Sequence, residues 1–222
     1  IGSTDGGSGA GTIRLANSDD PGTAFAFLPN SSAKGGDAWF GPSGALPTAG
    51  NYDWATILHE LGHSLGLSHG HDENADPEVD TGVPADVDSV EFTVMTYHTF
   101  VGDDLSGYKF ETWGAPQTFM MLDIAALQYL YGADYSVNNG DTVYSWDPNT
   151  GETYVDGVLA IDPGGNRIFA TIWDGGGFDT YDLSNYTTDL SIDLNAGGHS
   201  TFAAAQLADL NVLSPGNFRA RG

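Results

Sequence analysis

The sequence predicts an α+β fold in two parts, and three observations support this. Residues 1–132 contain two segments of helical periodicity, preceded by short strand patterns. Residues 133–222 contain short strand patterns separated by Gly, Asp and Asn turns, which is typical of a β-rich region. With 222 residues, among them 11 Phe, 10 Tyr and 5 Trp, the chain is long and aromatic enough to bury a core.

The charge balance is strongly acidic. Lys and Arg number 6 against 30 Asp and Glu, which gives a net charge of −24. Such a chain repels phosphate groups, so nucleic acids and anionic membranes are not expected as partners. No apolar run approaches the roughly 18 residues that a membrane-spanning helix needs. Cysteine is absent, which excludes disulfides, thiolate zinc sites and cysteine nucleophiles.

The first part opens with a Gly/Ser-rich segment followed by three strand patterns. Residues 1–11 are expected to form a flexible lead-in and contain no secretory signal region. Strands are predicted at residues 12–16, 23–28 and 37–40. The pattern at 23–28 alternates small and aromatic residues before Pro29, so we expect this strand at the edge of its sheet.

A first helix is predicted from Trp54 to about Leu65, with Asp53 as its N-cap. Its apolar residues, at helical spacing, leave two histidines on another side of the helix; they are Ile57, Leu58, Leu61 and Leu65. Gly62 inside this helix costs about 1 kcal/mol relative to alanine. That cost is tolerated where another group must approach the backbone closely.

A second helix is predicted to begin at Pro116 and to end at Gly132. Its apolar residues follow the i, i+4, i+7, i+11 pattern, namely Met120, Ile124, Leu127 and Tyr131. Strands are predicted beyond it, at residues 141–146, 168–173, 180–183 and 190–194. The change in character predicts a domain boundary near residue 132.

The segment from His59 to His69 carries the clearest chemical signal. On a helix, His59 and His63 lie on one face one turn apart, so both can face one metal ion. Gly66 can end the helix in a left-handed conformation and turn His69 back to the same point. Three imidazoles with one open position are the ligand set of catalytic zinc. Glu60 is close enough to reach a water at that position.

The motif H-E-x-x-H-x-x-G-x-x-H followed by a methionine turn is the metzincin signature, and here it is complete from His59 to His69 with Met95. Within the metzincins, this sequence resembles the serralysins, the secreted RTX-type bacterial metalloproteases. The similar segments cover the methionine turn, an edge strand, the second helix and two Gly/Asp-rich turns. They are residues 94–97, 24–29, 122–132, 139–144 and 173–181.

The resemblance implies a metzincin-like catalytic domain followed by the start of an RTX-type calcium-binding β-roll or sandwich domain. It implies a zinc metalloendopeptidase in which Glu60 is the general base on the water at zinc. Tyr97 would be a displaceable fifth zinc ligand and would stabilise the reaction intermediate. Met95 would form an apolar floor beneath the histidines. Extended protein or peptide substrates would pair with an edge strand formed by Ala24, Phe25, Ala26 and Phe27.

A calcium site is predicted in the second part. Residues 174–181 match most of a glycine-rich calcium repeat, in which Gly176 and Gly177 turn carbonyls inward and Asp174 and Asp179 supply carboxylates. The resemblance adds the carbonyls of three upstream residues to this shell: Asn138, Gly140 and Thr142. A single glycine-rich turn is also compatible with an ordinary hairpin.

Two departures from the serralysins stand out. Gly70 follows the third histidine, where serralysins usually have proline. The upstream helix and strands of the catalytic domain and the long glycine-repeat β-roll have no counterpart in this sequence. We therefore expect both domains to be incomplete here, with another polypeptide or precursor segment completing them.

Simpler interpretations accompany these predictions. HExxH also occurs by chance on amphipathic helices, and Met95 or Tyr97 in a plain packing role would look the same in sequence. Gly66, His69 and Met95 together favour the metal site. The remaining histidines lack ligand spacing and are expected to be solvated or hydrogen-bonded: His71, His98 and His199. The alternative function is a non-catalytic calcium-binding assembly or adhesion component that retains a protease-derived domain.

Overall fold

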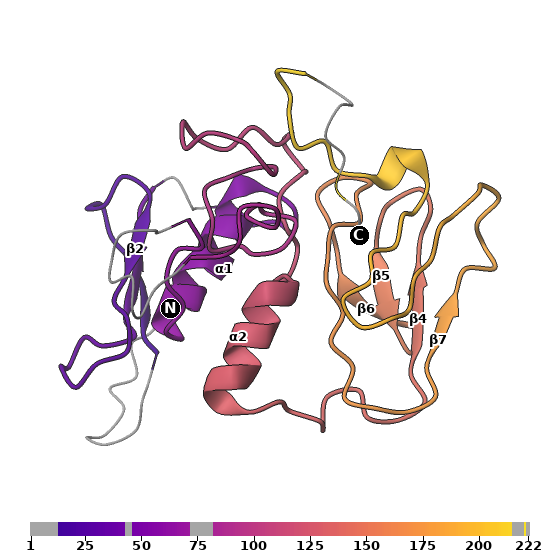
Figure 1. Ribbon diagram of the computed structural model, residues 1–222, viewed down its shortest axis with the longest axis horizontal. Coiled ribbons are helices and arrows are strands. Elements are labelled where there is room, and N and C mark those ends of the chain that lie inside the picture. The colour runs from indigo at the N-terminus through magenta and orange to yellow at the C-terminus, as the bar shows by residue number, and fades with distance from the viewer. Residues whose placement is uncertain (1–12, 43–45, 72–81, 215–219, 221–222) are drawn as a thin grey trace.

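The computed structural model describes residues 13–42, 46–71, 82–214 and 220, and it has the predicted α+β class (Figure 1). The predicted lead-in at residues 1–11 lies outside the described residues. A three-stranded sheet with the first helix stands at one end of the molecule and a four-stranded sheet at the other, with the second helix between them (Figure 1). No helix in the described part has the length and apolarity to cross a bilayer.

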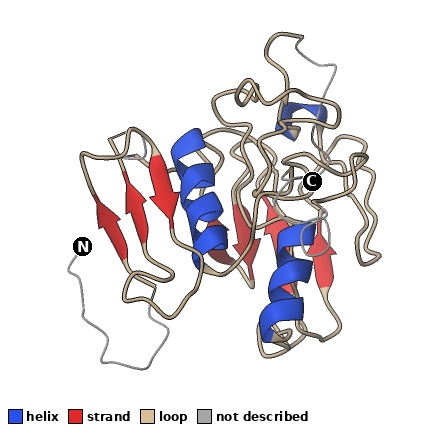
Figure 2. Cartoon of the chain, turned by 60° about the vertical axis from the view of Figure 1, so that its left-hand side comes forward, coloured by secondary structure: helices blue, strands red, loops and turns tan. Residues whose placement is uncertain are grey.

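The first sheet consists of β1 (Leu15–Asn17), β3 (Ala38–Phe40) and β2 (Ala24–Ala26), in that order. β1 pairs with β3 in parallel and β2 pairs with β3 antiparallel. β2 therefore lies at an edge, as the sequence predicts. α1 (Tyr52–Ser64) lies beside this sheet and contacts β2 and β3 (Figure 2).

α1 begins two residues earlier than predicted, and the prediction of Asp53 as its N-cap is wrong. Asn51 caps the helix, because its side-chain oxygen accepts the Trp54 N–H at 2.8 Å. Asp53 instead lies in the first turn, where its charge favours the helix dipole. The sequence suggests that another group approaches the helix closely at Gly62, and this group is Met95. A Cβ at Gly62 would overlap the Met95 sulfur.

α2 (Met121–Tyr131) begins five residues later than the predicted start at Pro116. The intervening segment is bonded to another part of the chain: Gln117 donates its N–H to Phe169 O at 2.8 Å, and Thr171 donates its N–H to Thr118 Oγ1 at 2.8 Å. α2 then starts where the Asp123 carboxylate accepts the Met120 N–H at 2.8 Å. It ends at Gly132, whose φ is +85°.

The second sheet has the order β6-β5-β4-β7, with β4 (Val143–Trp146) parallel to β7 (Thr180–Asp182). Both strands fall inside predicted segments. The sequence analysis missed the antiparallel hairpin of β5 (Thr153–Val155) and β6 (Val158–Ile161). Asp156 and Gly157 form its two-residue turn with φ of +51° and +74°, and Asp-Gly is a strong signal for such a turn.

Two predicted strands are wrong. Residues 168–173 form no regular strand, because their backbone groups bond to separate segments, as when Ile168 donates its N–H to Gln206 O at 2.9 Å. Residues 190–194 contribute only an isolated bridge between Ser191 and Thr201. In residues 168–173 the apolar composition reflects the burial of Ile168 and Phe169 rather than strand pairing, whereas Leu194 in the second segment is exposed.

Packing continues across residue 132, where the domain boundary is predicted. Met95 and Met120 share one buried cluster with Phe169 and Leu210. A second cluster lies within the β-rich region and includes Tyr144, Trp146, Ile168 and Phe202. Arg167 also reaches back to hold both carboxylate oxygens of Glu111, at 2.6 and 2.8 Å. The two regions thus share part of one core, and the boundary stays a prediction.

Candidate metal centre and catalytic site

Three histidine side chains converge on one point beside α1. The Nε2 atom of His69 lies 3.1 Å from that of His63 and 3.2 Å from that of His59. His59 and His63 are one helical turn apart. Gly66 ends the helix with φ of +99°, which few other residues adopt, and the chain then returns His69 to the same point. Among the described residues, this is the one group of at least three His, Cys, Asp or Glu whose ligand atoms cluster closely enough for a metal.

Backbone carbonyls fix the orientation of two of these rings. His59 Nδ1 lies 2.8 Å from Val94 O, and His63 Nδ1 lies 2.7 Å from Leu67 O. A carbonyl only accepts, so each Nδ1 carries the proton and each Nε2 presents its lone pair to the shared point. Burial lowers the pKa of His59 to about 3, which keeps that ring neutral. Three converging imidazole nitrogens fit a zinc ion.

Glu60 lies beside these ligands with its carboxylate largely buried. Its Oε2 atom is buried and has no hydrogen-bond partner in the part of the chain that the structure describes. Burial also raises the pKa of this carboxyl to about 7. A buried carboxylate oxygen without a partner among the described residues, next to three converging imidazole nitrogens, is suited to accept a proton from a reacting water.

Met95 and Tyr97 lie against the histidine cluster from the loop that follows it. Met95 is 2% exposed, and its sulfur packs against α1 at Gly62. The Tyr97 ring lies 5.5 Å from the His59 ring and 4.8 Å from the His69 ring, measured between centroids. The structure therefore brings both residues to the cluster, while their roles as floor and as fifth ligand stay predictions.

Gly70, the departure from the serralysin pattern, is hydrogen-bonded to this loop. It donates its N–H to Met95 O at 3.0 Å and accepts the Val83 N–H at 2.7 Å. Proline has no N–H and could not make the first bond. This chain thus ties the segment after His69 directly to the methionine turn.

Asp123 supports the site from α2, and the sequence analysis missed it. Its carboxylate, 2% exposed, accepts the Thr93 hydroxyl, the Val94 N–H at 2.9 Å and the Met120 N–H. Val94 is the residue whose carbonyl orients His59, so Asp123 is linked to that imidazole through the backbone of one residue. Burial raises the pKa of Asp123 to about 6 while the three donors oppose the rise. In the sequence, Asp123 is the one charged residue of the largely apolar α2, and this could have marked it as a residue with a structural role.

Asp88 is a second residue that the sequence analysis missed. One of its carboxylate oxygens accepts the Thr96 hydroxyl, and the other lies 2.7 Å from His98 Nδ1. These two partners flank Tyr97, so Asp88 fixes the backbone on both sides of it. Tyr108 adds a third restraint by donating its hydroxyl to Thr96 O at 2.8 Å.

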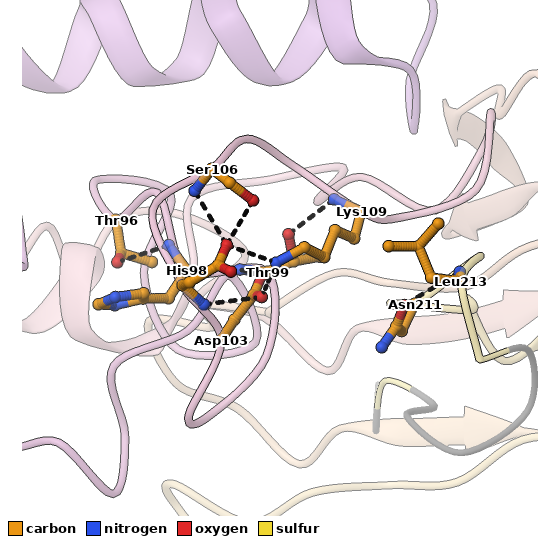
Figure 3. Close-up of polar contacts among 9 residues, drawn as sticks. Thr96, His98, Thr99, Asp103, Ser106, Lys109, Asn211 and Leu213 are labelled. Carbon is orange, nitrogen blue, oxygen red and sulfur yellow. Dashed lines mark hydrogen bonds and ion pairs between the residues drawn. The ribbon is translucent and has the colours of Figure 1, made fainter.

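The loop that carries Tyr108 is held by a lysine and two aspartates (Figure 3). Lys109 pairs with Asp103 and, at 2.7 Å, with Asp104. Asp103 also accepts the Thr99 N–H at 3.0 Å, while Lys109 donates its backbone N–H to Thr99 Oγ1 at 2.8 Å. These contacts close residues 99–109 into a compact loop beside Tyr97.

The other histidines have identifiable contacts. His98 is hydrogen-bonded to Asp88, in agreement with the interpretation from the sequence. His71 accepts the Tyr97 N–H at 3.2 Å, and its ring stacks on His69 with centroids 5.0 Å apart. His199 packs edge-on against Phe92. Residues 72–81, which follow His71, lie outside the described part of the chain.

The predicted edge-strand residues divide between two environments. Phe25 stacks on Trp39, with centroids 5.2 Å apart, and Phe27 meets the same ring edge-on at 5.7 Å. Ala24 and Ala26 pair with Phe40 and Ala38, which are buried. Ala24 also borders a small pocket beside Glu60. β2 therefore runs along the catalytic side with its outer edge unpaired within the described sheet.

The predicted calcium residues come together at the start of the parallel pair β4 and β7. Asn138 O and Gly140 O each lie 3.2 Å from Thr142 Oγ1, and Asp179 Oδ1 accepts the Thr142 N–H at 3.0 Å. Gly177 has φ of +144°, and a Cβ there would overlap Gly140 O. Only glycine permits this close approach.

Asp174 and Gly176, the two remaining predicted residues, lie in the second of the two segments that form this junction, residues 138–142 and 174–179. Asp174 accepts the Gly176 N–H at 2.8 Å and the Tyr144 hydroxyl at 2.6 Å. Gly176 has φ of +139°. Carbonyl and carboxylate oxygens from segments more than 30 residues apart thus lie around Thr142 and Tyr144, and such oxygens are the ligands that calcium prefers.

Comparison with known proteins agrees with these features. The family model described as Peptidase M10 serralysin C terminal matches residues 133–206. Serralysin from Proteus mirabilis is 40% identical over 209 residues, which cover 87% of this chain and 40% of that protein. Serralysin C from Dickeya chrysanthemi is 37% identical over 185 residues, covering 80% and 36%, respectively. Metalloprotease AprA from Pseudomonas entomophila is 34% identical over 202 residues, covering 86% and 40%.

The chain spans less than half the length of these relatives. The alignment with the Proteus mirabilis protein leaves only about 29 of the 222 residues outside it. It therefore spans the segment from His59 to Tyr97 and most of the part matched by the family model.

Proposed function

This chain is serralysin-like over most of its length, and from this premise we propose that it is a zinc-dependent metalloendopeptidase. One observation carries the proposal: three histidine Nε2 atoms converge beside a buried glutamate oxygen that has no hydrogen-bond partner among the described residues. That arrangement supports hydrolysis at a metal better than a structural metal site, which would need a fourth protein ligand.

In this proposal His59, His63 and His69 hold the zinc. When bound, zinc supplies Lewis-acid polarisation of the scissile carbonyl and lowers the pKa of water. Glu60 takes a proton from the attacking water and returns it to the leaving amine. Tyr97 donates its hydroxyl to the oxygen on which negative charge develops. Asp123 and the carbonyl of Val94 hold the His59 ring so that its lone pair stays in place.

The substrate would be an extended segment of a protein. β2 lies at an edge of its sheet and borders the pocket that contains Glu60. A peptide that adds to this edge through main-chain hydrogen bonds would bring its carbonyls past the catalytic residues. This mode favours cleavage within unfolded or looped segments of proteins.

Calcium would bind at the junction of residues 138–142 and 174–179. The carbonyls of Asn138 and Gly140 lie close to Thr142, beside the Asp179 carboxylate. The ion would hold the starts of β4 and β7 together, so its role would be structural. Resemblance to the secreted serralysins supports an extracellular, bacterial location.

We further propose that another polypeptide segment packs on this chain. α2 carries side chains that are both apolar and exposed, with Tyr129 91% and Tyr131 63% accessible. β1 has a second open edge in the described sheet. Intact mass measurement of the native protein would identify such a segment, and a stable, active monomer of this chain alone would contradict it.

Cleavage of casein or a quenched peptide tests the main proposal. The native protein, with any segment that packs on this chain, should cleave in the presence of zinc, and Glu60→Ala in that protein should abolish cleavage while zinc stays bound at one ion per chain. A wild type without cleavage would reject the proposal and leave the non-catalytic calcium-binding alternative. Zinc content, measured by elemental analysis of both proteins, separates loss of chemistry from loss of the metal.

A further inference from the structure

His71 lies beside the proposed zinc site without belonging to the three converging histidines. Its Nδ1 accepts the Tyr97 N–H, with 3.2 Å between the two nitrogens. Its ring stacks on the His69 ring, with centroids 5.0 Å apart and planes 20° apart. The His71 ring also lies 4.6 Å from the Tyr97 ring, measured between centroids. His71 therefore contacts both a proposed zinc ligand and the residue proposed to stabilise the developing charge.

The backbone around Gly70 explains why a side chain accepts the Tyr97 N–H. Gly70 donates its N–H to Met95 O, which is the first bond of a pairing between two parallel segments. The next bond of such a pairing would run from the Tyr97 N–H to Gly70 O. Gly70 O instead accepts the Val83 N–H at 2.7 Å. The His71 imidazole thus takes the place of a backbone carbonyl as the acceptor.

This bond also fixes which nitrogen of His71 is the acceptor. An N–H only donates, so Nδ1 of His71 presents its lone pair to Tyr97, and the neutral ring carries its proton on Nε2. His59 and His63 have the opposite arrangement, because their Nδ1 atoms face carbonyls. The Nδ1 lone pair of His71 is therefore directed at the loop that carries Tyr97 and not at the shared point of the three other histidines.

The peptide unit between Thr96 and Tyr97 is held at both of its polar atoms. Its carbonyl oxygen, Thr96 O, accepts the Tyr108 hydroxyl at 2.8 Å. Its N–H, which belongs to Tyr97, is the group that His71 accepts. Thr96 itself is fully buried, and the Tyr97 side chain is 38% exposed. Two side chains from separate segments thus set the plane of one peptide, and this plane sets the direction in which the Tyr97 side chain leaves the backbone.

We infer that His71 is a positioning residue, which places the Tyr97 hydroxyl by fixing this peptide plane. The inference rests on the proposed function and adds a residue to it. The hydroxyl lies at the far end of a long side chain, so a small rotation of the peptide displaces it more than it displaces the backbone. A donor to a developing negative charge acts only when it is held in place beforehand. A misplacement of about 1 Å can lower a rate by about 10²-fold.

Three substitutions of His71 separate its hydrogen bond from its ring. His71→Ala removes both, His71→Phe keeps a ring, and His71→Asn keeps an acceptor near the position of Nδ1. In the native protein, with any segment that packs on this chain, the first two should lower kcat about 10–100-fold and change KM less than about twofold. His71→Asn should stay within about threefold of the wild type. His199→Ala, which removes a partly buried histidine outside the site, should leave kcat unchanged.

A double-mutant cycle with Tyr97→Phe tests whether His71 acts through the tyrosine hydroxyl. In the Tyr97→Phe background, His71→Ala should lower kcat by less than about threefold, because the group that it positions is already absent. An equal loss in both backgrounds would overturn the inference. Zinc content should stay at one ion per chain in every variant. If His71→Ala loses zinc together with activity, His71 acts through His69 and the inference is wrong.

Hydrogen exchange at the Tyr97 amide gives a measurement that does not need activity. His71→Ala and His71→Phe should speed this exchange at least about tenfold, while His71→Asn and His199→Ala should keep the wild-type rate. Wild-type kcat in both His71→Ala and His71→Phe would overturn the positioning role and leave the protease intact. If the wild type cleaves nothing, the proposed function fails and exchange decides whether His71 holds Tyr97. Faster exchange in both variants supports that contact, and wild-type exchange in both rejects it.

Discussion

The histidine cluster on α1 and the oxygen-rich junction of residues 138–142 and 174–179 are built in different ways. The cluster uses side chains of one helix and its following turn, and backbone carbonyls orient two of the rings. The junction uses main-chain carbonyls and carboxylates of two segments that precede the parallel strands β4 and β7. One site is largely local in sequence, and the other exists only when the β-rich region is assembled.

This difference predicts different behaviour when each ion is removed. The backbone hydrogen bonds of α1 are made within the helix, so its imidazoles stay close together without help from an ion. At the junction, the carbonyl and carboxylate oxygens belong to two segments that are far apart in sequence, and a bound cation would tie these segments together. Zinc should therefore govern the chemistry, while calcium should govern the local structure of the β-rich region.

The largest expected effect is on activity. His63→Ala removes one of the three proposed ligands and with it the several kcal/mol that a Lewis acid contributes to the transition state, so cleavage should fall at least about 10³-fold. Hydrogen exchange should show the amides of α1 still protected. Activity close to wild type would reject the metal assignment, and unfolding of α1 would break the contrast between the two sites.

An intermediate effect on stability is expected at the junction. At a calcium concentration 100 times its Kd, binding stabilises the fold by about 2.7 kcal/mol, or about 5–10 °C in Tm for a chain of this length. EGTA should remove this increment in the wild type and speed hydrogen exchange at residues 138–142 and 174–179. Gly177→Ala should lose the calcium-dependent increment, because its Cβ overlaps Gly140 O and its φ is +144°.

Gly140→Ala is the matched control for that experiment. A Cβ at Gly140 would meet nothing within 4 Å, and its carbonyl would be retained. This variant should keep the response of Tm to calcium. An equal response in Gly177→Ala would show that calcium does not bind at this junction.

The same contrast explains what the sequence could predict. His59, His63 and Gly66 lie within eight residues, so helical spacing and glycine conformation are enough to bring the imidazoles together. β2 and β3 were also predictable, because strand and turn patterns are local. The start of α2 was not, since Gln117 and Thr118 bond to residues more than 50 positions away.

Strand assignment failed where burial and pairing differ. Residues 168–173 are apolar because Ile168 and Phe169 fill two buried clusters, yet their backbone groups bond to separate loops. The hairpin of β5 and β6 is the converse case, a strand pair that the sequence analysis missed. Its Asp156-Gly157 turn is a local hairpin signal that the sequence analysis did not use. Asp88 bonds Thr96 and His98, which are only 8 and 10 residues away, but it does so in a stretch without helix or strand, where no periodic pattern predicts which side chains meet.

The smallest expected effect tests how far the helix-borne site depends on its surroundings. Asp123→Ala leaves the Thr93 hydroxyl and the N–H groups of Val94 and Met120 without their buried acceptor, so Val94 O should hold His59 less firmly. Zinc affinity, measured by competition with a chelator, should fall about 10–100-fold. Asp123→Asn keeps one oxygen, and both backbone N–H groups bond to the same carboxylate oxygen, so it should lose less than about tenfold.

Two controls separate positioning of His59 from general loss of stability. Asp134→Ala removes an exposed carboxylate that is hydrogen-bonded to Ser136, and it should leave zinc affinity unchanged. Ile168→Val loosens the other buried cluster at a cost of about 0.5–1.5 kcal/mol, and it should lower Tm without weakening zinc binding. If Ile168→Val weakens zinc binding as much as Asp123→Ala does, zinc affinity follows overall stability. The link from Asp123 through Val94 to His59 would then be wrong.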